Sequence, residues 1–164
     1  NRGLEVRIAR FQNSYGPEGT WQGGREKAPA AICRKVAMTD DGGEIEVWGD
    51  GTALRVYTYV DDICDGIYAL AHSDIREPTN IGATELTSVK QLVDTVADLA
   101  NKKVTIRYID GPVGVHARYH TIDRLEAATG WKARISLREG IAITYPWIRS
   151  QVGSEPQANA TSFR

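Results

Sequence analysis

The stretch LRVYTYVDD, residues 54–62, decides the fold class of this chain. Residues 54–59 alternate between apolar and polar side chains, which is the pattern of a half-buried strand. Directly after them come Asp61 and Asp62, whose short carboxylates are suited to capping the first turn of a helix. That helix is predicted to run to about His72. A strand that leads straight into a helix indicates an α/β protein.

Further strands and helices are predicted on both sides of this stretch. The predicted strands span residues 4–11, 44–48, 79–82 and 104–109. The predicted helices begin near Arg25 and at positions 88, 121 and 136. Sequences typical of capping boxes open two of these helices, and Gly130 is placed to end a third. We therefore expect one α/β body over residues 1–152 and a polar tail, 153–164, that is disordered.

The composition excludes several classes of function. A formal net charge of −1 provides no general attraction to nucleic acid or to an anionic membrane, so neither is an expected partner. No apolar run approaches the length of a membrane span, and no signal-peptide stretch opens the chain, so the cytoplasm is the expected compartment. The two cysteines, Cys33 and Cys64, are expected to be reduced, partly buried thiols. No Cys or His spacing is that of a zinc site, so no metal is expected.

Several short motifs follow one another along the chain. They are NSYGP (13–17), GGREKAPAA (23–31), WGDG (48–51), RVYTYVDD (55–62), NIG (80–82) and TGW (129–131). Their order and spacing resemble those of extended short-chain dehydrogenase/reductases that act on nucleotide sugars. The motif at 23–31 is specific to a smaller group of these enzymes and resembles the GDP-mannose 3,5-epimerases in particular. The resemblance covers about residues 4–150. It implies the C-terminal, substrate-binding domain of such an enzyme, with residual strands of its Rossmann sheet.

The resemblance also implies which residues contact the nucleotide sugar. Physical chemistry points the same way, because a diphosphate needs fixed cationic donors and arginine binds phosphate oxygens in pairs. The implied contacts are Asn13, Glu26, Lys27, Ala28, Lys35, Arg55 and Arg118. Two positions depart from a simple match. Either His116 or Arg118 can occupy the family's arginine position, and Ala53 replaces a residue that is polar in the family.

Lys27 is the one residue of this set for which the resemblance implies a catalytic role. In the family, C4 of the hexose is oxidised to a ketone by NAD, which makes the protons on C3 and C5 acidic. A base and an acid on opposite faces of the ring then invert both carbons. The resemblance implies that Lys27 is the residue on the acid side of the ring. The family's base is a cysteine earlier in the chain, and neither Cys33 nor Cys64 matches it.

The redox half of such an enzyme is not represented in this sequence. The chain contains no Gly-x-x-Gly-x-x-Gly motif, which would hold the pyrophosphate of a dinucleotide, and no Tyr-x-x-x-Lys motif. In the family both motifs lie before the strand that is predicted at residues 4–11. We therefore expect NAD to serve the intact enzyme, a missing N-terminal Rossmann half to be a partner, and no cofactor-binding residue within this chain.

Three functions remain open at this point. The first is a fragment of a GDP-hexose epimerase that supplies substrate contacts and is inactive alone. The second is a non-catalytic accessory module that binds a nucleotide sugar or another protein. The third is another nucleotide-sugar epimerase, a dehydratase or a decarboxylase, which the motif at 23–31 argues against.

Overall fold

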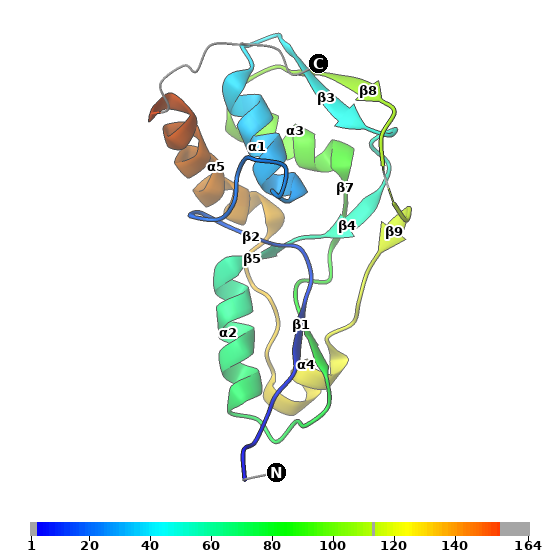
Figure 1. Cartoon of the computed structure of the whole chain (residues 1–164), viewed down its shortest axis with the longest axis vertical. Coiled ribbons are helices and arrows are strands. Elements are labelled where there is room, and N and C mark those ends of the chain that lie inside the picture. The colour runs from blue at the N-terminus through cyan, green and yellow to red at the C-terminus, as the bar shows by residue number, and fades with distance from the viewer. Residues whose placement is uncertain (1–2, 113, 155–164) are drawn as a thin grey trace.

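The computed structural model describes residues 3–112 and 114–154, and Figure 1 shows how their helices and strands are arranged. The helices are α1 (Ala28–Met38), α2 (Val60–Ala71), α3 (Val89–Leu99), α4 (Asp123–Thr129) and α5 (Leu137–Ser154). The strands are β1 (Ala9–Phe11), β2 (Ser14–Tyr15), β3 (Glu44–Trp48), β4 (Leu54–Val56), β5 (Thr58–Tyr59), β6 (Thr79–Ile81), β7 (Leu86–Ser88), β8 (Thr105–Ile109) and β9 (Ala117–Arg118). Helices and strands alternate along the chain, so the predicted α/β class is confirmed.

The strands form small sheets that join distant parts of the sequence. Three parallel pairs, β1 with β6, β2 with β5 and β3 with β8, bring together segments that lie far apart along the chain. Strand β4 lies between β7, to which it is antiparallel, and β9, to which it is parallel. Because parallel strands need long crossover connections, helices occupy the intervening sequence.

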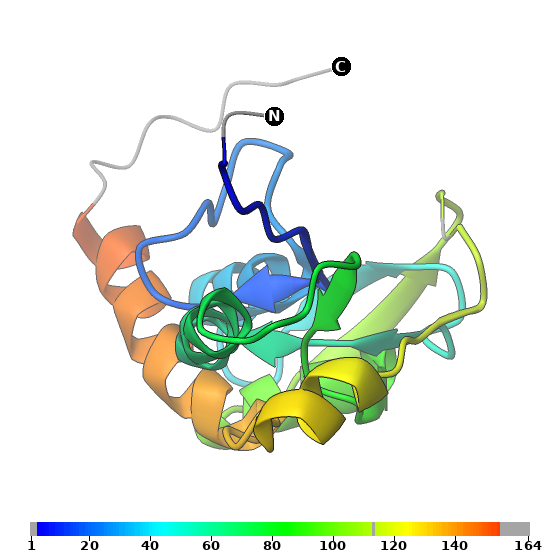
Figure 2. The same ribbon diagram turned by 90° about the horizontal axis from the view of Figure 1, so that it is seen from below.

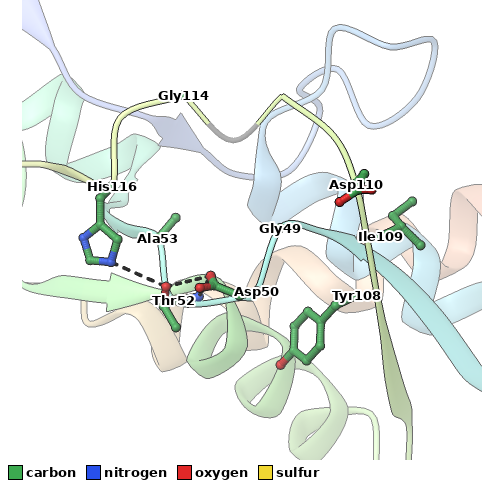
Figure 3. A pocket seen from close by; sticks show the side chains of 9 residues that line it. All are labelled: Gly49, Asp50, Thr52, Ala53, Tyr108, Ile109, Asp110, Gly114 and His116. Carbon is green, nitrogen blue, oxygen red and sulfur yellow. Dashed lines mark hydrogen bonds between the residues drawn. The ribbon is translucent and has the colours of Figure 1, made fainter.

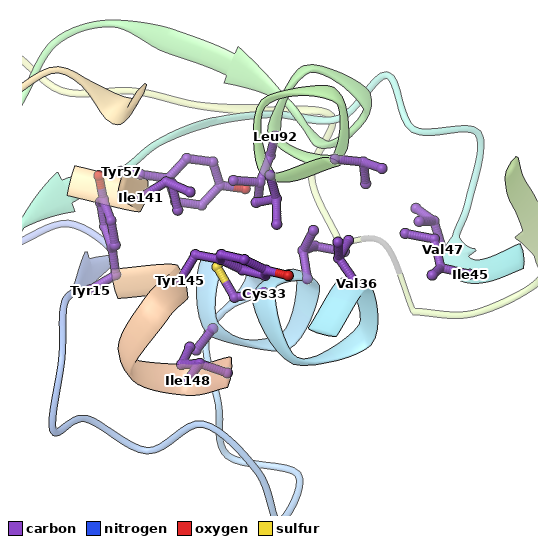
Figure 4. Close-up of a cluster of buried hydrophobic side chains, with 14 of the residues drawn as sticks. Tyr15, Cys33, Val36, Ile45, Val47, Tyr57, Leu92, Ile141, Tyr145 and Ile148 are labelled. Atoms are coloured by element: carbon purple, nitrogen blue, oxygen red, sulfur yellow. The ribbon is translucent and has the colours of Figure 1, made fainter. Parts of the chain in front are cut away.

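The larger of two hydrophobic clusters lies among α1, α3 and α5, which pack against one another. Cys33 and Val36 of α1, Leu92 of α3 and Ile148 of α5 meet there (Figure 4). Burial raises the pKa of the Cys33 thiol to about 12, so this thiol stays protonated and unreactive at neutral pH. Cys64 is exposed on α2, so the expectation that it is partly buried is wrong.

A second, smaller cluster lies between α2, α4 and β6. Ile63 of α2, Ile81 of β6, Leu125 of α4 and Trp131 are buried in it. Gly66 lies on the face of α2 that meets them. A Cβ at this position would contact Ile81 and would lie 2.9 Å from a ring atom of Trp131. The glycine therefore allows α2 to approach these two side chains closely.

Helices lie along one side of the molecule, and irregular segments of the chain lie along the opposite side. Seen from below, α4 and α5 lie along one side, and the N-terminal segment 3–8 lies opposite them with the loop 16–27 (Figure 2). Helix α5 continues to Ser154, two residues into the segment that was expected to be disordered. Residues 155–164, the rest of that predicted tail, lie outside the described residues.

Several element boundaries differ from those that the sequence predicts. The strand expected at residues 4–11 is regular only over β1, and the strand expected at 54–59 divides into β4 and β5 at Tyr57. The helix expected near Arg25 begins three residues later, at Ala28. Pro29 follows directly, and a proline fits the first turn of a helix because no hydrogen bond is needed from that nitrogen.

Asp61 and Asp62 do not cap α2, contrary to the prediction. The N-cap residue is Tyr59, and no side chain caps it. The carboxylate of Asp62 is buried and accepts hydrogen bonds from the backbone N–H groups of Arg134 at 3.1 Å and Ile135 at 2.9 Å. Asp62 therefore ties α2 to the segment before α5, so that the backbone donors of that segment are satisfied away from water.

The predicted capping boxes and the glycine stop are confirmed. The hydroxyl of Ser88 accepts from the N–H of Gln91 at 3.1 Å, and the side chain of Gln91 accepts from the N–H of Ser88 at 2.8 Å. Ser136 and Glu139 form the same reciprocal pair before α5. Gly130 ends α4 with φ 70°, the left-handed conformation that glycine adopts most readily.

Candidate functional site

An open pocket of about 550 Å³ lies where β3 and β8 end and β4 begins (Figure 3). Its lining residues are Gly49, Asp50, Thr52, Ala53, Tyr108, Ile109, Asp110, Gly114 and His116. The carboxyl ends of the parallel strands β3 and β8 meet at this point. In α/β proteins, ligands bind in crevices at the carboxyl ends of parallel strands, so the pocket is a candidate site.

The turn after β3 is held by its own hydrogen bonds. The carboxylate of Asp50 accepts from the hydroxyl of Thr52 at 2.6 Å and from its N–H at 2.9 Å, and these bonds lower the pKa of Asp50. Gly51 has φ 77°, and a Cβ there would lie 2.7 Å from the ring of Tyr108. The left-handed backbone and the closeness of the tyrosine both require glycine at this position of the Gly-Asp-Gly turn.

Arg55 and Arg118 lie side by side on neighbouring strands. The parallel register of β4 and β9 pairs these two residues, so both side chains leave the same face of the sheet. Nη1 of Arg55 donates to the carbonyl of His116 at 3.1 Å, and its Nη2 would lie 4.0 Å from a Cβ at Gly114. Since His116 and Gly114 line the pocket, Arg55 lies at its edge. The register places Arg118, and not His116, opposite Arg55.

Lys27 is the N-cap residue of α1, and its side chain is exposed. The carboxylate of Glu26, directly before it, forms an ion pair with Arg34 of α1 at 3.0 Å. Burial would raise the pKa of Glu26, but hydrogen bonds from its own N–H, from Arg34 and from the N–H of Gly24 lower it overall. The ion pair attaches the glycine-rich loop to α1 and so fixes the position of Lys27 at the start of this helix.

Asn13, Ala28 and Lys35 have structural contacts of their own. Nδ2 of Asn13 donates to the carbonyl of Val56 at 2.9 Å, while the backbone of Asn13 is left-handed with φ 33°. Nζ of Lys35 donates to the carbonyl of Glu46 on β3 at 2.5 Å, and burial lowers the pKa of Lys35. Ala28 packs against the larger hydrophobic cluster. The fold therefore uses these three residues even where no ligand is bound.

Tyr108 and Asp110 line the pocket and are among the residues that the sequence motifs did not single out. Tyr108 lies in β8, where a strand was expected, and Asp110 directly follows this strand. The signal that points to them is positional, because they stand at the carboxyl end of a parallel strand. That β8 pairs with β3 was not apparent from the sequence. None of the seven predicted contact residues is among the described lining residues, although Arg55 donates a hydrogen bond to one of these, His116.

Within residues 3–112 and 114–154, no group of His, Cys, Asp or Glu side chains is arranged to hold a metal ion. No helix in the same ranges combines the length and the apolar character that crossing a bilayer requires.

The parallel strand pairs, with helices between them along the chain, place the molecule in the broad class of α/β proteins. Comparison with known families narrows this broad class to one family. Residues 1–82 match the model of the NAD dependent epimerase/dehydratase family, and the chain belongs to that family.

Individual relatives agree with this assignment. GDP-mannose 3,5-epimerase of Arabidopsis thaliana is 44% identical over 153 residues, which are 93% of this chain and 40% of that protein. UDP-glucuronic acid decarboxylase 5 of the same plant is 30% identical over 92% of this chain and 43% of its own length. The chain thus spans about 40% of the length of the curated relatives it matches.

Solved structures show the same fold. The UDP-glucose 4-epimerase of Thermotoga maritima, determined with UDP-glucose, superposes with a TM-score of 0.81 at 24% identity. The match covers 92% of this chain and 48% of that one. MoeE5, determined with UDP-glucuronic acid and NAD, gives a TM-score of 0.73 at 28% identity over 90% of this chain and 48% of its own. The resemblance to extended short-chain dehydrogenase/reductases that the sequence motifs indicate is therefore confirmed.

Proposed function

We propose that this chain holds the nucleotide sugar in a GDP-hexose epimerase that inverts C3 and C5 of the sugar. The observation that carries the proposal is the pairing of Arg55 with Arg118 at the edge of the pocket. Like charges at paired positions on one face of a sheet repel each other. A diphosphate between the two guanidinium groups would remove this repulsion and would accept hydrogen bonds from both.

The choice of a GDP-hexose rests on the relatives. Identity with GDP-mannose 3,5-epimerase is 44%, whereas identity with UDP-glucuronic acid decarboxylase 5 is 30% over a similar length. The motif at 23–31, which includes Glu26, Lys27 and Ala28, points the same way. In this proposal Asn13, Lys35 and these three residues complete the set of contacts to the nucleotide sugar.

Lys27 is the proposed proton donor of this half of the enzyme. Its ammonium group is exposed at the start of α1, where it can reach a hexose that lies over the loop. A lysine can serve as a general acid when its proton is held at a carbon that is changing configuration. The ion pair of Glu26 with Arg34 keeps the loop in place, so that Lys27 does not move away from the sugar.

The residues of this chain do not fit NAD, which is the cofactor of the family. A dinucleotide needs a glycine-rich turn between a strand and a helix. Here β5 passes directly into α2, with Tyr59 as the N-cap residue and no intervening loop. The glycine-rich loop between β2 and α1 has Gly16 and Gly19 but Gln22 where the third glycine of the dinucleotide motif would stand. The sequence has neither Gly-x-x-Gly-x-x-Gly nor Tyr-x-x-x-Lys. No proton transfer or contact proposed here therefore passes through the cofactor.

The intact enzyme would join this chain to a cofactor-binding half. The segment before β1 exposes Leu4, Val6 and Ile8, and Phe11 within β1 is also half exposed. Such a row of apolar side chains next to a strand is suited to further strands of a sheet. We propose the cytoplasm as the compartment and expect this chain alone not to epimerise GDP-mannose.

The test is a titration of the chain with GDP-mannose, followed by two-dimensional NMR of the backbone amides. We expect weak binding, with shifts near Arg55, Arg118 and Lys27. Arg55→Ala and Lys27→Ala should each weaken binding about tenfold, because each removes a hydrogen bond from a charged donor. Lys103→Ala, an exposed lysine outside the site, should leave binding unchanged. If GDP-mannose shifts no amide near these residues, the accessory-module function is the better description.

A further inference from the structure

The pocket beside Arg55 has one end that is cationic and another that is acidic. Arg55 donates to the carbonyl of His116, so its charge lies at the His116 end. Asp110, directly after β8, stands at the opposite end of the pocket (Figure 3). A ligand with a diphosphate at one end and hydrogen-bond donors at the other would match this separation of charge.

Asp110 is the carboxylate of this pocket that can offer both of its oxygens to a ligand. In the other carboxylate, Asp50, Oδ1 already accepts from the hydroxyl and the N–H of Thr52. Asp110 is exposed, and within the described part of the chain no hydrogen bond or ion pair joins its carboxylate to another residue. Both of its oxygens are therefore open as acceptors.

Aromatic rings flank this acidic end. Tyr108 lines the pocket and is 44% exposed, and Trp48 at the end of β3 is 55% exposed. The backbone of Gly111 lies on the indole, since a Cβ on Gly111 would be 2.6 Å from Cγ of Trp48. This contact holds the residue that follows Asp110 against Trp48. Exposed aromatic faces next to hydrogen-bonding groups are suited to the stacking of a nucleobase.

We propose that Asp110 makes the site selective for guanine, by accepting the ring N1–H and the exocyclic N2–H of the base with its two carboxylate oxygens. This inference rests on the proposed function, because it assumes that a nucleoside diphosphate occupies the pocket. Guanine presents two adjacent donors on this edge, which a carboxylate can accept together. Uracil presents one N–H between two carbonyl groups, so a carboxylate would face at least one carbonyl oxygen. Asp110 would repel that edge.

The test compares three diphosphates, GDP, IDP and UDP, by isothermal titration of the whole 164-residue chain. IDP lacks only the exocyclic amine of GDP, so it reports the second of the two hydrogen bonds. We expect GDP to bind at least about fivefold more tightly than IDP or UDP, the lower end of what a bidentate base contact provides. Asp110→Asn should bring the three affinities together, because an amide offers one acceptor and places a donor beside the base.

Asp65→Asn on α2 is the charge-matched control, since Asp65 is also exposed but lies outside this pocket. It should keep the preference for GDP. Equal affinities for the three diphosphates in the unmodified chain, or an unchanged preference in Asp110→Asn, would overturn the role of Asp110. The proposed function would survive either result if Arg55→Ala still weakened all three. Failure of every diphosphate to bind would overturn both proposals.

Discussion

Single residues of this chain carry structural and proposed ligand-binding roles at the same time. The side chain of Asn13 donates a hydrogen bond to the carbonyl of Val56, and the side chain of Lys35 donates one to the carbonyl of Glu46. A substitution at either position would disturb the fold as well as any ligand contact. Arg118, which is exposed at the edge of a strand, is the better position for a test of binding alone.

His120 is a residue whose environment makes the stability of the fold depend on pH. Both of its ring nitrogens are buried without a hydrogen-bond partner, and a Cβ on Gly82 would lie 2.8 Å from Nε2. Burial lowers the pKa of His120 from its ordinary value of 6.5. The folded state therefore binds this proton less readily than the unfolded chain does, and a neutral ring contributes stability that is present above pH 6.5.

We predict that the free energy of unfolding falls as the pH is lowered through 6.5 and stops falling, as far as His120 is concerned, below its folded pKa. Urea unfolding between pH 5 and pH 7.5 would measure this dependence. His120→Asn removes the titrating ring and should flatten the curve over this window. An identical curve for the variant would mean that another group is responsible.

Helix ends determine how the elements of this protein are fixed to one another. Nζ of Lys102 donates to three carbonyls at the end of α1, those of Val36 at 3.0 Å, Ala37 at 3.3 Å and Thr39 at 2.5 Å. These are carbonyls that a helix cannot satisfy internally, and a cation is favourable at this end of the helix dipole. Lys102 thus joins the chain after α3 to α1, whose other end carries the proposed acid Lys27.

Lys102→Met should destabilise the chain by about 2 kcal/mol, because the charged donor is lost and the carbonyls of α1 lose their partner. Lys103→Met is the matched control, since the side chain of Lys103 is exposed, and it should change stability by less than about 0.5 kcal/mol. The measurement is urea unfolding at neutral pH. Equal effects of the two substitutions would show that the contacts of Lys102 add nothing to stability.

At the scale of the whole molecule, the unusual feature is the apolar surface next to β1. Strand β1 pairs with β6, and within residues 3–112 and 114–154 no strand occupies its other edge. Ile8, just before β1, is 50% exposed, and Leu4 and Val6 are more exposed than Ile8. An open strand edge with apolar side chains is a surface on which two chains can associate.

We predict that the isolated chain self-associates through this edge at high concentration. Ile8→Lys should shift the equilibrium toward the monomer, because a charge at a strand edge opposes pairing. Ile143→Lys is the control, as Ile143 is also 50% exposed but lies on α5 and not on the edge of β1. Sedimentation velocity over a range of concentrations measures the association. A chain that stays monomeric throughout, or that responds equally to both substitutions, would contradict the prediction.

Short sequence patterns were sufficient to predict those helix ends that are fixed by contacts between residues close together in the chain. The reciprocal bonds of Ser88 and Gln91 and the left-handed Gly130 involve residues within a few positions of each other. Periodicity and capping residues therefore predict them. The same reasoning failed for Asp62, because its partners Arg134 and Ile135 lie in a distant part of the chain. A short carboxylate at a helix start has the same appearance in the sequence whether it caps that helix or holds another segment.

The stretch at residues 54–62 and the motifs around it determined, by sequence alone, that this is an α/β protein of the NAD dependent epimerase/dehydratase family. They also singled out Arg55 and Arg118 without showing that the two are neighbours. Only the tertiary structure decided that β9 lies beside β4 and that β8 ends beside β3. Strand pairing depends on the packing of side chains across the whole chain, and no local pattern encodes it. The pocket with Asp110 is a consequence of that pairing.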